Sequence, residues 1–184
     1  SIQHVDIAKS VDKHFKDVFE KYRFKKIANN DYANNNCIFR ISIIDHSTIR
    51  MEFAKKEEPY EFFNLYGFLC TTIKEKYYDL EFNLFTPKYQ KNETPEEATD
   101  NHIKMLSKFA KSYLVAPFSG DFSWQDDYYE VTSFLQNIRA IIKRDDTYSE
   151  LRPLLNDYKQ GSIRKLGKEA LMIYFENNQM KNKG

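Results

Sequence analysis

Apolar residues near the start of the chain are spaced like one face of a helix, which predicts an amphipathic helix from about Asp6 to Tyr22. Charged residues fill the positions between them, so the helix has one side for solvent and one side for packing. The apolar positions are Ile7, Val11, Phe15, Val18, Phe19 and Tyr22. Such a helix must pack on another part of the chain.

The spacing of the apolar residues changes to every second position between Cys37 and Phe53, which predicts a β-hairpin. Apolar and polar side chains alternate on both sides of a turn near residues 45–47. One face of the hairpin is therefore expected to be buried and the other to be wetter. We expect Ile41, Met51 and Phe53 to lie on the buried face.

The segments on either side of the hairpin give weaker patterns. Phe24–Ile27 predicts a short strand. The asparagine-rich residues 29–36 predict a turn, because Asn side chains bond to the local backbone. Asn64–Glu75 fits a helix or strands equally well, so the sequence leaves both open there. Tyr77–Phe85 is expected to be extended.

A strong helix start lies at Thr94–Glu97. Thr94 is a favoured N-cap, Pro95 suits the first helical position and Glu97 completes a capping box. This helix is expected to end at Pro117 and Gly120.

Three more helices are predicted after Gly120. The first begins at Ser123–Asp126, and the other two cover about Ser149–Tyr158 and Ser162–Asn177. The polar tail, residues 178–184, is expected to fray.

Strands come early in the chain and helices come late, which predicts an α+β fold rather than alternating parallel βαβ units. The expected architecture is a small antiparallel sheet, with its hairpin at about 37–53, packed by the N-terminal helix and by a C-terminal run of about four helices. A length of 184 residues with no linker fits a single domain over residues 1–184.

Charge and the length of the apolar runs argue against two classes of partner. The 28 Lys+Arg nearly balance the 27 Asp+Glu, and a nucleic-acid-binding function is disfavoured because it usually needs a basic excess. The longest apolar runs are about six residues, too short to insert in a membrane, so a cytoplasmic location is expected. Cys37 and Cys70 are far apart and are expected to be unpaired thiols.

Motifs that would identify an enzyme are missing from the sequence. The 4 histidines stand in no metal-ligand spacing. No glycine-rich phosphate loop and no GxSxG nucleophile motif is present. We therefore expect no cofactor and no metal, and an enzyme or small-ligand-binding protein whose site is assembled from distant residues is the alternative function.

The segment from Pro117 to Glu130 holds the only Trp together with several other aromatic residues and acids. We take it as a candidate binding surface for another protein, because exposed Trp and Tyr often anchor interfaces. The candidate residues are Asp121, Phe122, Trp124, Asp126 and Asp127. Their acids would favour a partner with a basic surface. The competing interpretation is that Trp124 is a core residue and that the acids complement a helix dipole.

Two parts of the sequence resemble small bacterial proteins of unknown function, some of which are similar to immunity proteins paired with toxins. The resemblance covers the hairpin Cys37–Phe53 and the helix-turn Leu106–Trp124, which contains Tyr113-Leu114, Pro117-Phe118 and Gly120-Asp121-Phe122. It implies a non-enzymatic protein-binding role of the immunity or accessory type. High Lys, Asn, Tyr and Ile usage agrees with a bacterial source.

Overall fold

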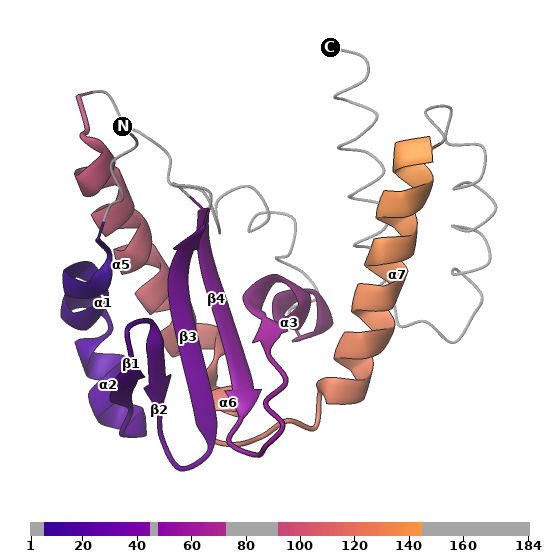
Figure 1. Ribbon diagram of the computed structural model, residues 1–184, viewed down its shortest axis with the longest axis horizontal. Coiled ribbons are helices and arrows are strands. Elements are labelled where there is room, and N and C mark those ends of the chain that lie inside the picture. The colour runs from indigo at the N-terminus through magenta and orange to yellow at the C-terminus, as the bar shows by residue number, and fades with distance from the viewer. Residues whose placement is uncertain (1–5, 45–47, 73–91, 145–184) are drawn as a thin grey trace. The chain divides into compact units, whose positions relative to one another are not determined.

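The computed structural model describes residues 6–44, 48–72 and 92–144 (Figure 1). The described residues form an antiparallel sheet and helices, so the α+β class is confirmed. The chain divides into two compact units, Ser1–Leu65 with Leu80–Phe122 and Tyr66–Asp79 with Ser123–Gly184. We describe each unit by itself, and the single domain over 1–184 stays a prediction.

The first unit contains a five-stranded antiparallel sheet in which the strands follow chain order. Its strands are β1 (Lys25–Ala28), β2 (Asp31–Ala33), β3 (Cys37–Ile44), β4 (Thr48–Lys55) and β5 (Phe63–Asn64). The predicted hairpin is the β3–β4 pair, in which Phe39 faces Phe53 and Ile41 faces Met51.

The prediction that residues 29–36 form only a turn is wrong. β2 lies inside this stretch and pairs with β1 on one side and with β3 on the other. The asparagines occupy the two ends of the stretch, and pairing with two neighbouring strands holds the three residues between them extended.

Four helices accompany this sheet in the described part of the first unit: α1 (Ala8–His14), α2 (Lys16–Tyr22), α5 (Pro95–Tyr113) and α6 (Val115–Phe118). The predicted N-terminal helix is present as α1 and α2, which meet at the fully buried Phe15. In Figure 1 no described helix lies in front of β3 and β4, and α6 passes behind these strands.

The core of the first unit lies between the sheet and these helices. Phe39 on β3 has its ring centroid 5.7 Å from that of Phe15 and 5.3 Å from that of Phe118 on α6. Ile41, Met51 and Phe53 are each at most 1% exposed, which confirms their predicted burial.

The start of α5 is as predicted, but its end is not. The Thr94 hydroxyl accepts a hydrogen bond from the Glu97 N–H at 3.2 Å, and Pro95 is the first helical residue. The helix ends at Tyr113 instead of reaching Pro117, which lies in the separate helix α6. A proline is tolerated there because the N–H groups of a helix's first turn have no acceptor within the helix, so the N–H that proline lacks is not missed.

The second unit contains α7 (Gln125–Arg144) and most of α3 (Leu65–Thr72). Trp124 lies edge-on to Phe68, with ring centroids 4.8 Å apart and planes at 75°. A Cβ at Gly67 would lie 2.5 Å from Cε2 of Tyr128, so only glycine fits this close approach.

Several predictions are decided only in part. Within Asn64–Glu75, Asn64 ends the strand β5 and α3 is a helix, while 73–75 lie outside the described residues. The stretch Tyr77–Phe85, predicted to be extended, also lies outside them. The predicted helices 149–158 and 162–177 and the tail 178–184 also lie outside them.

No helix in the described ranges is both long and apolar enough to cross a membrane. Cys37 is an unpaired, fully buried thiol, as predicted, and burial raises its pKa to about 12. The Cys70 side chain lies outside the described residues.

Candidate functional site

The structure does not expose the aromatic residues of the surface predicted around Trp124. Phe122 is 7% exposed and Trp124 is 6% exposed, because their rings pack against Phe63 and Phe68. These two residues are therefore not surface anchors, which corrects the prediction from the sequence.

The acids of that predicted surface fit the competing interpretation better. Asp126 and Asp127 lie in the first turn of α7, where negative charge complements the helix dipole. Asp121 and Asp126 are exposed and Asp127 is half-buried. Asp121 belongs to the first compact unit together with Phe122, whereas Trp124, Asp126 and Asp127 belong to the second.

A serine, an aspartate and a histidine meet between α1 and α5. The Ser10 hydroxyl donates to Oδ1 of Asp100 at 2.6 Å, and Nε2 of His14 lies 3.0 Å from the same oxygen. In a nucleophilic triad the histidine lies between the serine and the acid, whereas here the acid lies between the other two. The cluster therefore joins two helices and has the wrong order for serine activation.

Arg40 on β3 is a second polar centre, and two of its donors are bonded to Asp31. Its Nε and Nη2 donate to the two carboxylate oxygens of Asp31 at 2.7 and 3.0 Å. Its guanidinium carbon lies 4.1 Å from the ring centroid of Phe62. The hydrogen bonds that Arg40 donates to Asp31 raise the pKa of Arg40. Arg40 thus joins the neighbouring strands β2 and β3 through a bidentate ion pair that offsets its charge.

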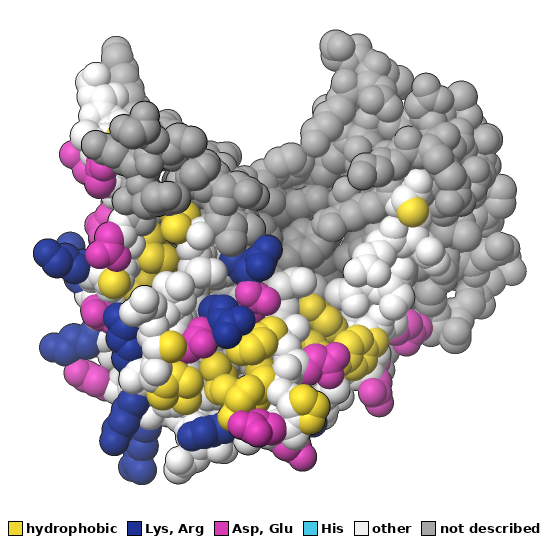
Figure 2. All heavy atoms as spheres, viewed as in Figure 1, with side chains coloured by type: hydrophobic (Ala, Val, Ile, Leu, Met, Phe, Trp, Pro, Cys, Tyr) yellow, Lys and Arg dark blue, Asp and Glu magenta, His cyan; other side chains and the backbone are white. Residues whose placement is uncertain are grey.

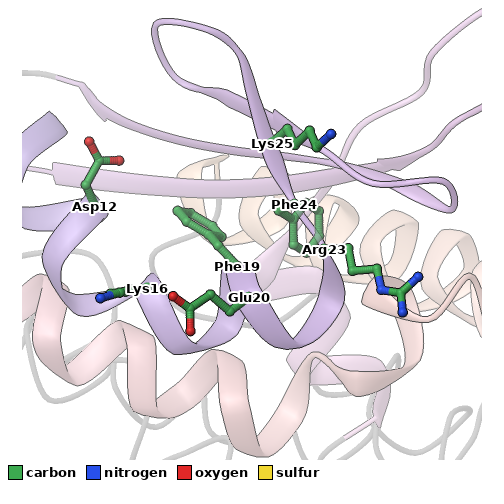
Figure 3. Close-up of a pocket in the computed structure, with 7 residues that line it drawn as sticks. All are labelled: Asp12, Lys16, Phe19, Glu20, Arg23, Phe24 and Lys25. Atoms are coloured by element: carbon green, nitrogen blue, oxygen red, sulfur yellow. The ribbon is translucent and has the colours of Figure 1, made fainter.

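A pocket of about 410 Å³ opens between the helices α1 and α2 and the start of β1 (Figure 3). Two aromatic rings form its apolar part and five charged side chains surround them. The lining residues are Asp12, Lys16, Phe19, Glu20, Arg23, Phe24 and Lys25. A concave apolar surface with charged groups at its rim has the general character of a binding site.

The apolar floor of the pocket is held in place by the core. Phe19 stacks on Tyr32 at 4.2 Å between ring centroids and lies edge-on to the buried Phe24 at 5.9 Å. The Tyr32 hydroxyl donates to Oδ1 of Asp12 at 3.0 Å. Burial, and then this hydrogen bond, raise the pKa of Tyr32, so the hydroxyl remains a donor. A floor that is already ordered loses little conformational freedom when something binds.

Arg23 occupies a backbone position that favours glycine. It follows α2 with φ 59° and ψ 40°, in the left-handed region. The helix closes here, since the Phe24 N–H donates to the Phe19 carbonyl at 2.9 Å. A non-glycine residue in this conformation costs about 1 kcal/mol. The Arg23 side chain extends from the rim of the pocket (Figure 3).

Among the described residues, the cations at the rim have no ion-pair partner. Lys16, Arg23 and Lys25 are exposed, and no ion pair within the described part of the chain engages them. Residues 12–26 hold six cations against three acids, whereas the whole chain has a net charge of only +1. The cations are Lys13, Lys16, Lys21, Arg23, Lys25 and Lys26, and the acids are Asp12, Asp17 and Glu20. The pocket lining itself holds three cations and two acids, so its rim carries a small excess of positive charge.

The pocket adjoins an exposed sheet edge. β1 is the first strand of the sheet, and in the described part of the chain it pairs with β2 alone. Its four residues are all exposed, and Ile27 reaches 58% exposure beside a β-bulge. Figure 2 shows Lys and Arg side chains along the lower left margin of the view, over α2 and the β1–β2 hairpin. Among the described residues no strand pairs with the outer side of β1, and its short length, two lysines and bulge oppose pairing with strands that are not complementary to it.

Sequence reasoning missed this site. It assigned Phe19 to a core-facing stripe and Lys16 to the solvent side of one helix, which gives no sign of a pocket. The available signal was the run Arg23, Lys25 and Lys26 directly after a helix end. Comparisons of the chain with protein-family models, with curated proteins and with solved structures find no match.

Proposed function

We propose that the chain is a non-enzymatic protein-binding domain that holds its partner at the β1 edge, by which we mean β1 together with the adjoining pocket. One observation carries the proposal: Lys25 belongs both to an exposed edge strand and to the lining of an ordered apolar pocket. An added strand gains affinity from main-chain hydrogen bonds, and a neighbouring pocket gives selectivity by receiving a side chain.

The chemistry of the pocket favours binding over reaction. Its lining holds Lys, Arg, Asp, Glu and Phe side chains and contains no His, Cys or Ser. Among the described residues, no group of three His, Cys, Asp or Glu side chains is placed to hold a metal ion. Catalysis by side chains needs a nucleophile or base that is oriented by a second group. Exposed charges around an aromatic floor serve recognition more directly.

The proposal includes the immunity or accessory type and a bacterial cytoplasmic setting. The resemblance of the hairpin and of the helix-turn before Trp124 supports the type. The unpaired thiol of Cys37 supports a reducing compartment. A partner with a basic surface is not part of the proposal, because it depended on exposed rings at Phe122 and Trp124 and both are buried.

Selection from a displayed library of random peptides tests the proposal, with the full chain immobilised. We expect enriched peptides that bind the native chain and lose about tenfold or more in affinity to a Lys25→Glu, Lys26→Glu variant. The matched control is Lys104→Glu with Lys108→Glu, which changes charge equally on the exposed side of α5 and should leave affinity unchanged. Absence of enrichment, or peptides insensitive to both variants, would overturn the proposal.

A further inference from the structure

The inference that follows rests on the proposed function and concerns the chemistry of the partner. We infer that the occupant of the β1 edge is an acidic, extended segment of another protein, which pairs with β1 as an additional strand. Three features of the described residues lead to this occupant: the surplus of unpaired cations, the free strand edge and the poor fit of other occupants.

The charge argument concerns the groups that an incoming strand would meet. Lys25 and Lys26 lie on β1 itself, and Arg23 precedes it at the pocket rim. Opposite charges on neighbouring strands stabilise their pairing, whereas like charges directly opposite each other destabilise it. A strand that carries Asp or Glu is therefore favoured beside β1, and a basic strand is disfavoured.

The strand argument concerns the length and shape of β1. The strand has four residues, and its register with β2 shifts between Lys26 and Ala28. Main-chain pairing alone would thus supply few hydrogen bonds, each worth about 1 kcal/mol. The exposed side chain of Ile27 and the pocket floor at Phe19 add apolar contact next to this short ladder. The free edge of β1, the apolar contact beside it and the cations together fit an extended chain as the occupant.

Two other occupants fit less well. A second copy of this chain that paired edge to edge would place the Lys25–Lys26 pair of one molecule close to that of the other, which like-charge repulsion opposes. The opposite sheet edge, β5, has two residues and continues directly into α3, so it offers little strand to pair with. A single-stranded nucleic acid would use the cations but would leave the main-chain groups of β1 unpaired.

Synthetic peptides with alternating residues test the inference. The probes are Val-Glu, Val-Lys and Val-Ser repeats of about eight residues, the length of an ordinary strand. We expect the Val-Glu peptide to bind at least about tenfold more tightly than the other two, and to weaken as salt is added. Hydrogen exchange should show new protection of the amides of Lys25–Ala28, while Lys25→Glu with Lys26→Glu abolishes binding and Lys104→Glu with Lys108→Glu does not.

Two N-methylated forms of the Val-Glu peptide separate strand pairing from simple charge attraction. One form is methylated at every Val amide and the other at every Glu amide, so only one of them loses the N–H groups that face β1. One form should therefore bind about tenfold more weakly than the other, since more than one hydrogen bond is lost. Equal binding of both forms, or no protection of β1, would overturn strand pairing.

The outcomes distinguish this inference from the proposed function. Library-selected peptides that bind at Lys25 and Lys26 but are uncharged or basic would overturn the acidic occupant and leave the proposed function standing. Binding by neither library nor synthetic peptides would overturn both. An oligothymidine that binds at Lys25 and Lys26 where the Val-Glu peptide does not would overturn the inference in favour of a nucleic acid. A dimer that forms in sedimentation and disperses in the Lys25→Glu, Lys26→Glu variant would overturn it in favour of a second copy.

Discussion

The side-chain amide nitrogen of Asn34 donates to the main-chain carbonyl of Phe118 at 3.0 Å, although the two residues are 84 positions apart in the chain. The same nitrogen donates to the carbonyl of Tyr22 at 2.9 Å. Tyr22 and Phe118 are the last residues of α2 and α6. The last carbonyls of a helix have no partner within it, so one buried amide completes the ends of two helices.

This relationship predicts a large effect of Asn34→Asp. The carboxylate has nearly the same shape, but it cannot donate and would face two carbonyl oxygens in a buried site. We expect the free energy of unfolding to fall by about 3 kcal/mol in urea denaturation. The exposed neighbour gives the control, since Asn35→Asp should change stability by less than about 0.5 kcal/mol. If both variants lose a similar amount of unfolding free energy, then the Asn34 amide does not stabilise the ends of the two helices.

Local signals explain what the sequence could predict. The β3–β4 hairpin was predictable because Phe39 and Phe53 face each other within an unbroken alternation. The start of α5 was predictable because the bond between Thr94 and Glu97 spans three residues. β2 was not, because three residues are too few to show a period.

The candidate site was beyond prediction for a related reason. Its pocket needs Phe19 to stack on Tyr32 and α2 to end at Arg23, and both depend on how the sheet packs on the helix. The burial of Trp124 likewise follows from Phe68, a residue in the stretch for which the sequence left helix and strand open. Contacts between residues distant in the chain are not encoded in local spacing.

Two tyrosines in the first unit should respond oppositely to removal of the hydroxyl. The Tyr22 hydroxyl is buried and has no hydrogen-bond partner in the described part of the chain. Tyr22→Phe should therefore leave the free energy of unfolding unchanged or raise it by up to about 1 kcal/mol. Tyr32→Phe should lower it by about 1 kcal/mol, because the bond to Asp12 is lost. Paired urea unfolding curves measure both, and a loss from Tyr22→Phe would reveal a partner.

The Asp100 cluster predicts a pH dependence of stability. Burial raises the pKa of Asp100, but the hydrogen bonds from Ser10 and His14 and the nearby positive charge outweigh it, so the pKa is lowered from its ordinary 3.8. A carboxyl group with a lowered folded-state pKa stabilises the fold above its unfolded-state pKa. This contribution disappears as the pH falls through the folded-state pKa.

We therefore expect Asp100→Asn to cost less than about 1 kcal/mol near neutral pH, because the carboxylate is 38% exposed and partly screened. The difference between the variant and the native chain should shrink below about pH 4. Urea unfolding across this range measures it. Asp17→Asn, at an exposed ion pair with Lys111, should show a smaller cost at neutral pH. A difference for Asp100→Asn that grows in acid would contradict the argument.

Because Trp124 is buried, we expect its replacement to lower the stability of the fold. Trp124→Ala removes a ring that packs on Phe68 and Tyr128, and it should lower the free energy of unfolding by about 3 to 5 kcal/mol. Thermal melting measures the loss. Asp126→Asn, at an exposed position in the first turn of α7, should change it by about 0.5 kcal/mol. A Trp124→Ala variant that melts like the native chain would restore Trp124 as a surface residue.

Arg23 is expected to lower the stability of the fold and to strengthen binding of the partner. Arg23→Gly relieves the left-handed conformation at the end of α2, so the free energy of unfolding should rise by about 0.5 to 1 kcal/mol. The same change removes a guanidinium from the rim of the pocket. Affinity for the Val-Glu peptide should therefore fall by about fivefold, since an exposed charge pair contributes up to about 1 kcal/mol.

Arg23→Lys separates the two effects, because it keeps the charge and also keeps a side chain in the strained conformation. It should retain most of the affinity and gain no stability. Arg50→Gly gives a contrast on β4, where glycine should destabilise the strand and leave peptide affinity unchanged. Urea unfolding and calorimetric titration on the same samples measure both quantities. If Arg23→Gly is more stable and still binds the peptide as well as the native chain does, then the strain at Arg23 has been relieved without loss of affinity. The Arg23 guanidinium would then have no part in binding the peptide.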